Sequence, residues 1–452
     1  MRTKKSVLIL FTLFIVFVVL LTACNTETDN QSEDSDTGSG VSESSVESVA
    51  DNESEASEPD EQSDQVSEAE ESKEPIHNEP TEHLSILAST LTDNNCFVVV
   101  GKCEEGAVIT ATTETQSVTT GSDKGFYSVR LNKEGTETRV TITATGTVTE
   151  QYTEDIKPVV PNSDMWPIVG GNEYNFFFQS MMPDFMHETS MSDFSLDSLT
   201  NRIKDRISRL NEELPGTEIV YMVVPSKASI YPELVPEDYP QGTKKSRLEQ
   251  VNKALEDAGA TVINLLDVYK EHKEDEYKIY WGTDSHWTDY SAFIAYTELF
   301  NHISDRFPAA APRKEIEFDF IGDYYNGGDM IYYMMMDQNI MQEYCHYRKP
   351  RFSLNSDIAS VPRYRAENYL MYSENTAAER VFHTGQSGMP NLYVMRDSFG
   401  AHIYDILADR SNTTVYKSMW AFTYNIGDIK QYSPDYIIYI MSEWNIDNII
   451  KG

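Results

Sequence analysis

From about residue 160 to residue 452, apolar runs alternate with segments whose apolar residues follow helical spacing, and this alternation constrains the fold most. Strands are predicted by "TEIVYMVVPSK", "TVINLL", "NLYVMR", "TTVYKS" and "PDYIIYIMSEW". Helices are predicted at 194–214, 244–260 and 288–307, and after "RDSFG". Strands that alternate with helices of this length favour a mainly parallel sheet covered on both faces, a three-layer α/β/α fold. Ligands of such sheets bind at the carboxyl ends of the strands.

Two stretches depart from this pattern. Residues 305–385, rich in Tyr and Met, interrupt the alternation and predict an insertion or cap. Residues 95–158 alternate β-branched or aromatic residues with polar ones between Gly-containing turns, which predicts short antiparallel strands in a small β-sandwich. The pattern of this second stretch resembles bacterial immunoglobulin-like modules.

The N-terminus predicts export and attachment to a membrane. A basic start and a long apolar run lead to "LTAC", which is typical of a signal peptide. The spacing resembles the lipobox of bacterial lipoproteins, in which Cys24 is lipidated; an uncleaved transmembrane anchor is the alternative. Both place the rest of the chain outside the cytoplasmic membrane.

The next segment is acidic and nearly devoid of aromatic residues. Residues 25–82 hold 20 acids and a single Lys, about half of the excess behind the net charge of −37. Such a composition cannot bury enough apolar surface to order itself, so we expect a disordered tether. The predicted domains are a signal peptide (1–24), an acidic linker (25–90), an immunoglobulin-like sandwich (91–158) and an α/β domain (159–452).

Charge and cysteine content exclude some functions. Nucleic acid is a poor partner, because binding a phosphate backbone needs clustered Lys and Arg. No Cys-x-x-Cys or Cys/His cluster supports a structural zinc site. Cys96 and Cys103 lie in "CFVVVGKC" and either form a disulfide or remain thiols.

Ser398 is the candidate nucleophile. It follows the apolar run "NLYVM" and opens a helix, so its hydroxyl would project from the sheet edge, beside helix N–H groups that can stabilise an oxyanion. Capping of the helix by this serine is the alternative, since Ser is a common N-cap.

The candidate base lies in "YWGTDSHWTDYSA" at 280–292. A serine nucleophile needs a histidine oriented by a carboxylate, and Asp284 can hold His286 through a local turn. The alternative is structural, with Asp284 as the first acid of the next helix and His286 packed on Trp287.

Five ordered blocks carry a family resemblance: "VVPSKASIYPE", "TDSHWTDYSAFIAY", "YYNGGDM", "VMRDSFG" and "SPDYIIYIMSEWN". Together they resemble the SGNH-hydrolase-like alginate O-acetyltransferase group, which includes AlgX, AlgJ and DHHW-type proteins. The resemblance covers about 160–452. It implies Ser398 as nucleophile, His286 as general base and Asp284 as its orienter.

The resemblance also implies supporting residues. Tyr404, Lys227, Trp287 and Arg396 are expected near bound substrate, although Lys227 is equally expected as a loop clamp and Trp287 as loop packing. Arg396 departs from the broader SGNH pattern, in which Gly often precedes the Asp-Ser pair, and no oxyanion donor beyond the Ser398 N–H can be assigned.

The sequence therefore predicts O-acetyl transfer to, or removal from, a cell-envelope or exported polysaccharide at the extracytoplasmic face of a bacterial membrane. No metal or organic cofactor is expected, and a membrane-bound O-acyltransferase is the implied acetyl donor. The alternative is a non-catalytic, glycan-binding surface lipoprotein with a degenerate SGNH-like domain.

Overall fold

The structure is a computed structural model. It describes residues 76–451 except 78–80, 82, 92–95, 123–124, 133–137, 157–167, 172–174, 335, 340–341, 356–357, 359–362, 366–369, 373–378 and 419–423. The predicted signal peptide, Cys24 and most of the predicted linker lie outside the described residues. Within the described part, no helix has both the length and the apolar character to cross a membrane.

The N-terminal described region consists of two β-sheets around a shared core. The first sheet contains β1 (Ile76–His77), β8 (Thr149–Ile156), β7 (Thr138–Thr145), β4 (Val108–Thr112) and β5 (Ser117–Gly121) in that order; the second contains β2 (Leu84–Leu91), β3 (Cys96–Cys103) and β6 (Phe126–Asn132). Their pairing is antiparallel, apart from the short β1–β8 contact. Alternate residues face the core, such as Ile109 and Ala111 of β4. β2 begins before the predicted boundary at residue 91, which corrects the end of the predicted linker.

The strand β3 excludes the disulfide that the sequence allowed. Cys96 is its first residue and Cys103 its last, so their Cα atoms lie about 23 Å apart at roughly 3.3 Å per residue. A disulfide requires Cα atoms within about 7 Å. Cys103 is a buried free thiol.

The second region is an α/β domain built on a six-stranded sheet. Its order is β12 (Thr261–Val262), β11 (Glu218–Val224), β20 (Tyr436–Ser442), β18 (Asn391–Arg396), β19 (Thr413–Ser418) and β17 (Arg380–His383). All neighbours are parallel except the edge pair β17–β19. The central strands β11, β20 and β18 are almost entirely buried, as expected for strands covered on both faces. The prediction of a mainly parallel sheet is confirmed.

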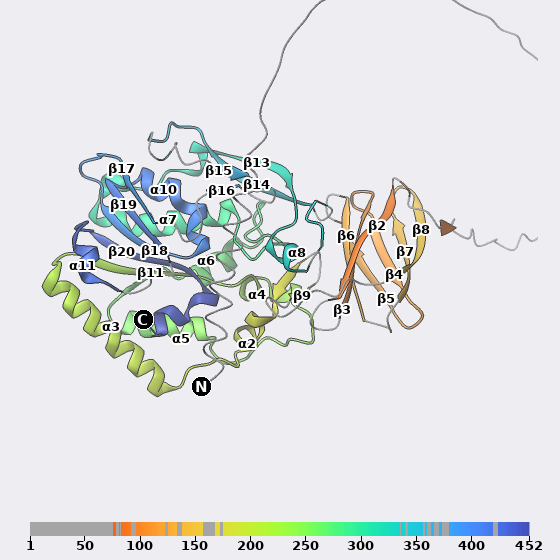
Figure 1. Cartoon of the computed structure of the whole chain (residues 1–452), viewed down its shortest axis with the longest axis horizontal. Coiled ribbons are helices and arrows are strands. Elements are labelled where there is room, and N and C mark those ends of the chain that lie inside the picture. Colours follow the sequence, from red (N-terminus) through yellow and green to blue (C-terminus); the bar gives the residue numbers. More distant parts are fainter. Residues whose placement is uncertain are drawn as a thin grey trace, which may run out of the picture. The chain divides into compact units, whose positions relative to one another are not determined.

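Helices cover both faces of this sheet. In Figure 1, α3 (Asp193–Glu213) and α5 (Arg247–Asp257) lie on one side, and α7 (Asp289–Arg306) and α10 (Tyr404–Asp409) on the other. The other α-helices among the described residues are α2 (Met182–Phe185), α4 (Lys227–Ile230), α6 (Leu265–His272), α8 (Asp329–Tyr333), α11 (Ile426–Lys430) and α12 (Asp447–Lys451). One predicted strand differs, because "TVINLL" forms only the two residues of β12 before Asn264 caps α6.

The Tyr- and Met-rich segment is an insertion outside the main sheet, except that its last strand, β17, pairs with β19 at the edge of that sheet. It contains the antiparallel pair β13 (Phe318–Tyr325) and β14 (Glu343–Pro350), with α8 between them, and the short pair β15 (Arg363–Arg365) and β16 (Leu370–Tyr372). Another short antiparallel pair, β9 (Ile168–Gly170) and β10 (Phe176–Phe178), precedes the main sheet in the chain. Short 3₁₀ turns lie at Gln179–Met181, Pro232–Leu234, Pro308–Ala310, Glu315–Glu317, Ser398–Ile403 (η5) and Glu443–Asn445.

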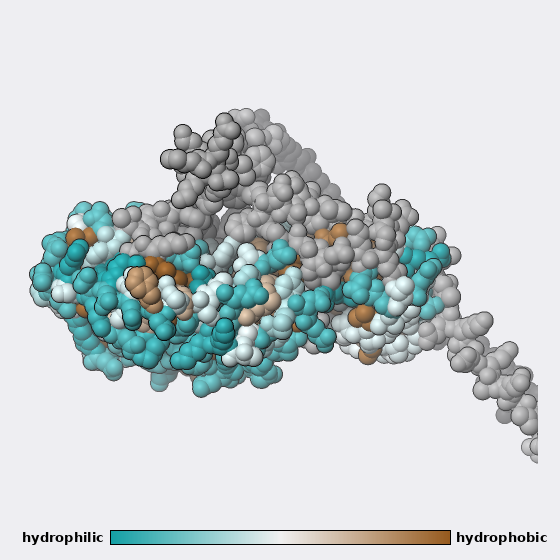
Figure 2. Space-filling view, turned by 90° about the horizontal axis from the view of Figure 1, so that it is seen from below, coloured by the Kyte–Doolittle hydropathy of each residue, from teal (hydrophilic) through white to brown (hydrophobic). Residues whose placement is uncertain are grey.

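The coloured part of the face drawn in Figure 2 is largely hydrophilic. Figure 2 shows hydrophobic residues on one face in small groups separated by hydrophilic ones. The large hydrophobic side chains exposed in the described part are Val108, Val148, Phe194, Ile316, Tyr332 and Val381, and they are scattered along the sequence.

Candidate active site

The site lies beyond the carboxyl ends of the central strands β18 and β20. Asp397 directly follows β18, and its carboxylate accepts hydrogen bonds from Phe399 N at 3.0 Å and Ser442 N at 2.7 Å. Asn445 Nδ2 donates to the same carboxylate at 2.9 Å. Asp397 therefore caps η5 and ties the ends of the two strands together.

Ser398 is the first residue of η5 and is only partly buried. Because Asp397 is the N-cap, the serine hydroxyl is not used for capping, which settles the alternative left open by the sequence. Its Oγ lies 2.8 Å from Nε2 of His286, which is 112 positions away along the chain.

His286 is held by a compact loop that ends at Thr288, the N-cap of α7. Asp284 Oδ1 accepts both the backbone N–H of His286, at 2.8 Å, and the ring Nδ1–H, at 2.7 Å. With Nδ1 donating, the neutral ring leaves Nε2 as an acceptor for the Ser398 hydroxyl. Asp284, His286 and Ser398 are thus joined in one hydrogen-bonded series.

The electrostatics favour an ion pair between Asp284 and His286. Burial lowers the pKa of His286, but Asp284 and the nearby carboxylates of Asp329 and Asp397 outweigh it and raise the pKa to about 9. Burial raises the pKa of Asp284, but the imidazole and two backbone N–H donors bring it below its ordinary value. The imidazolium form is therefore strongly stabilised here.

Lys227 clamps the loop that carries these residues. Its buried ammonium donates to the carbonyl oxygens of Trp281 and Gly282, both at 2.8 Å, and of Asp284 at 3.3 Å. Burial lowers its pKa to about 8, although Glu343 and Asp284 act in the opposite direction. Of the two roles that the sequence left open, this geometry matches the loop clamp.

The other three predicted substrate-binding residues are interior. Trp287, Arg396 and Tyr404 are at most 2% exposed. Trp287 Nε1 donates to Phe399 O at 3.1 Å, and the Arg396 guanidinium donates to the Tyr404 hydroxyl and lies 4.8 Å from its ring centroid. This placement corrects the expectation of direct substrate contact, because all three pack and brace the loops that carry the site.

Two acids of the insertion reach the loop and were missed by sequence reasoning. Glu343, at the start of β14, accepts from Gly282 N at 2.7 Å and Thr283 N at 3.0 Å. Asp329, at the start of α8, accepts from Ser285 N at 2.8 Å. The only sequence signal was the block "YYNGGDM", which contains Asp329.

Two carboxylates and the imidazole of the site also form a group that could hold a metal ion. Asp284, His286 and Asp329 each place a ligand atom within 4.8 Å of the others. These side chains already hydrogen-bond to protein partners in the loop, and we do not assign them as metal ligands. The expectation of a metal-free site stays a prediction.

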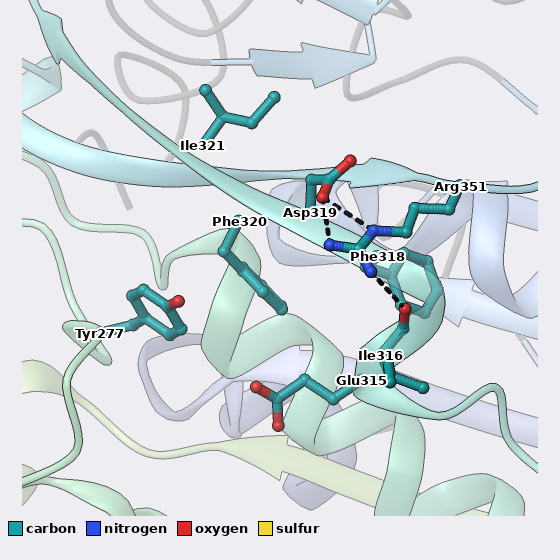
Figure 3. A pocket seen from close by; sticks show the side chains of 8 residues that line it. All are labelled: Tyr277, Glu315, Ile316, Phe318, Asp319, Phe320, Ile321 and Arg351. Atoms are coloured by element: carbon teal, nitrogen blue, oxygen red, sulfur yellow. Dashed lines mark hydrogen bonds and ion pairs between the residues drawn. The ribbon is translucent and has the colours of Figure 1, made fainter.

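A separate pocket of about 800 Å³ lies along β13, and its lining contains no member of the Asp284–His286–Ser398 series. In Figure 3 the ring of Phe320 lies between the ring of Tyr277 and an ion pair in which Arg351 donates to Asp319. The pocket is open and mixed in character, and we assign no role to it.

The fold and the site together define an α/β domain with a Ser–His–Asp arrangement at the carboxyl ends of parallel strands. Residues 185–354 match the family described as "SGNH hydrolase-like domain, acetyltransferase AlgX". This range includes Asp284, His286 and Asp329 but ends before Ser398.

A curated relative gives a similar result. The chain is 24% identical over 132 residues to the "Probable alginate O-acetylase AlgJ" of Azotobacter vinelandii, a match that spans 29% of this chain and 32% of that protein. The match thus covers about a third of the length of the relative.

Solved structures show distant likeness. PatB1 of Bacillus cereus has a TM-score of 0.46 and 15% identity, covering 62% of this chain and 97% of that one. A DHHW family protein from Eubacterium siraeum has a TM-score of 0.42 and 12% identity, covering 69% and 95%. The O-acetyltransferase domain of Pseudomonas putida AlgJ has a TM-score of 0.37 and 14% identity, covering 63% and 92%.

Proposed function

We propose that the protein transfers acetyl groups to, or removes them from, a cell-envelope or exported polysaccharide, with an acyl-enzyme formed on Ser398. The observation that carries this proposal is the series from Asp284 Oδ1 to His286 Nδ1, at 2.7 Å, and from His286 Nε2 to Ser398 Oγ, at 2.8 Å. The acetyl and polysaccharide parts take support from the AlgX family match and the AlgJ relative.

The first half-reaction acylates the serine. Ser398 Oγ attacks the carbonyl carbon of the acetyl donor as its proton passes to His286 Nε2. The imidazolium then gives that proton to the leaving oxygen as the bond to the donor breaks. Asp284 stabilises the imidazolium, and the Ser398 N–H at the start of η5 is one donor for the tetrahedral oxyanion.

The second half-reaction releases the acetyl group. A sugar hydroxyl, or water, gives its proton to Nε2 and attacks the acetyl carbon, and the proton then returns to Ser398 Oγ. Exclusion of water decides between transfer and hydrolysis. The proposal also includes an extracytoplasmic location, a lipid anchor at Cys24 and a membrane-bound acyltransferase that supplies acetyl groups.

The test uses the full chain with an isotope-labelled acetyl ester and candidate glycans. We expect an acetyl adduct on Ser398 and loss of turnover in Ser398→Ala and His286→Ala, while Ser304→Ala on α7 stays active. Labelled acetyl on the glycan demonstrates transfer, whereas labelled free acetate alone demonstrates an esterase. Glycan binding without any ester turnover, unchanged in Ser398→Ala, would refute the enzyme and favour the surface lipoprotein.

A further inference from the structure

Asp329 forms reciprocal hydrogen bonds with the loop that carries the proposed base. Its Oδ1 accepts from Ser285 N at 2.8 Å, and its Oδ2 accepts from the Ser285 hydroxyl. In return, Asp329 N donates to Asp284 Oδ2 at 2.9 Å. The two segments are 44 and 45 positions apart in the chain, so the insertion fixes this side of the loop.

The residues before Asp329 explain this close approach. Gly328 N donates to the Thr283 hydroxyl at 3.1 Å. A Cβ at position 328 would lie 2.3 Å from both Cβ and Oδ2 of Asp284, far inside van der Waals contact. Only glycine lets the backbone pass at this distance, and the Asp329 carboxylate is thereby fixed beside the loop.

The Asp329 carboxylate also faces the imidazole. Its Oδ2 is 3.9 Å from His286 Nδ1, and its side chain is 22% exposed, whereas Asp284 is 0% exposed. The ring therefore has one fully buried carboxylate and a second that reaches solvent. Opposite charges at this separation interact strongly in a partly desolvated site.

Several other titratable groups surround this pair. His286 is also under the influence of Asp397, and its ring centroid lies 5.9 Å from that of His402. Lys227 and Tyr333 interact electrostatically with Asp329. Burial and the nearby Asp284 raise the pKa of Asp329 to about 7, against the opposing effect of His286 and the Ser285 donors.

We propose that Asp329 is a positioning residue of the site, which holds Ser285 in place and shares with Asp284 the stabilisation of the imidazolium formed in each acyl-transfer step. This inference rests on the proposed function. It assigns to the β13–β14 insertion a direct part in the chemistry, through the carboxylate that it brings to the ring.

Asp329→Asn separates charge from structure, because the amide keeps the shape and can still accept from Ser285 N. Removing a negative charge beside the ring destabilises the imidazolium, so the pKa of His286 falls. The measurement is kcat/KM on a chromogenic acetyl ester as a function of pH. We expect the midpoint of the acid limb to shift to a pH lower by about one unit or more, with KM unchanged. Asp337→Asn, an exposed acid in the same α8–β14 connection, should leave the limb in place.

Two further variants guard against a purely structural effect. Asp329→Ala also removes the clamp on Ser285, so we expect a lower kcat than in Asp329→Asn. The double variant Asp284→Asn/Asp329→Asn should lose more activity than the product of the single losses, because either carboxylate partly replaces the other.

An acid limb that stays in place in folded Asp329→Asn, or single losses that simply multiply, would overturn this inference. Neither result would contradict the proposed function. That proposal fails separately if Ser398→Ala retains turnover.

Discussion

The Lys227 clamp gives a prediction whose size follows from the structure. Burial lowers the pKa of Lys227 from 10.5 to about 8, a change that corresponds to about 3 kcal/mol at 1.36 kcal/mol per unit. Below pH 8 the lysine is charged in both the folded and the unfolded chain, and the folded chain bears the cost of burying that charge. Between pH 8 and 10.5 the unfolded chain binds more protons, so the free energy of unfolding rises with pH.

The perturbation is Lys227→Met, which fills similar space without a charge. The difference in unfolding free energy between wild type and variant should grow in favour of wild type by about 3 kcal/mol from pH 7.5 to 10.5. Urea unfolding at several pH values measures it, and taking the difference cancels the other titrating groups. Lys253→Met, which removes an exposed lysine from α5, should give a nearly constant difference.

The same variant separates a clamp from a substrate-binding lysine. Loss of three hydrogen bonds to the loop carbonyls should misplace Asp284 and His286 and lower kcat with little change in KM. A raised KM with unchanged kcat would refute the clamp, and a stability difference that does not vary with pH would refute the lowered pKa of Lys227.

Three further predictions concern the site and the N-terminal sheets. Activity on an acetyl ester should rise with pH through about 9, because only the deprotonated form of His286 can accept the serine proton; a plateau from pH 6 upward would contradict this. Gly328→Ala should lower kcat by at least about tenfold, since a 1 Å displacement of catalytic groups can cost more than that, while Gly121→Ala, where an added Cβ meets nothing within 4 Å, should retain activity in the same assay. A reducing agent should leave the melting temperature unchanged, because the two cysteines of β3 cannot pair; a fall on reduction would show otherwise.

The sequence predicted the parts of the structure that depend on local pattern. The unbroken apolar run of β11 indicated a strand buried on both faces, and the structure confirms it. The spacing of Asp284 and His286 indicated a local turn, and Ser398 was placed at a strand end by the run before it. Each of these inferences needed only neighbouring residues and one general property of parallel sheets.

Other features depend on contacts that no local pattern records. Asp329 and Glu343 contact the loop because β13 and β14 fold back against it, and nothing in the neighbouring sequence of this Tyr- and Met-rich insertion indicates that contact. Arg396 and Tyr404 looked available for substrate, yet they pair with each other in the interior. The pairing of Cys96 with Cys103 depends on whether "CFVVVGKC" is one continuous strand, because only an extended strand holds its two ends too far apart for a disulfide.

The position of β20 has a consequence for how the chain is made. It is the last strand of the described chain, yet it lies between β11 and β18 at the centre of the sheet. Until residues 436–442 have been synthesised, β11 and β18 have no common neighbour, and their apolar edges remain open to other strands. Premature termination before Tyr436 would therefore remove the middle strand of the sheet and leave the facing edges of β11 and β18 unpaired.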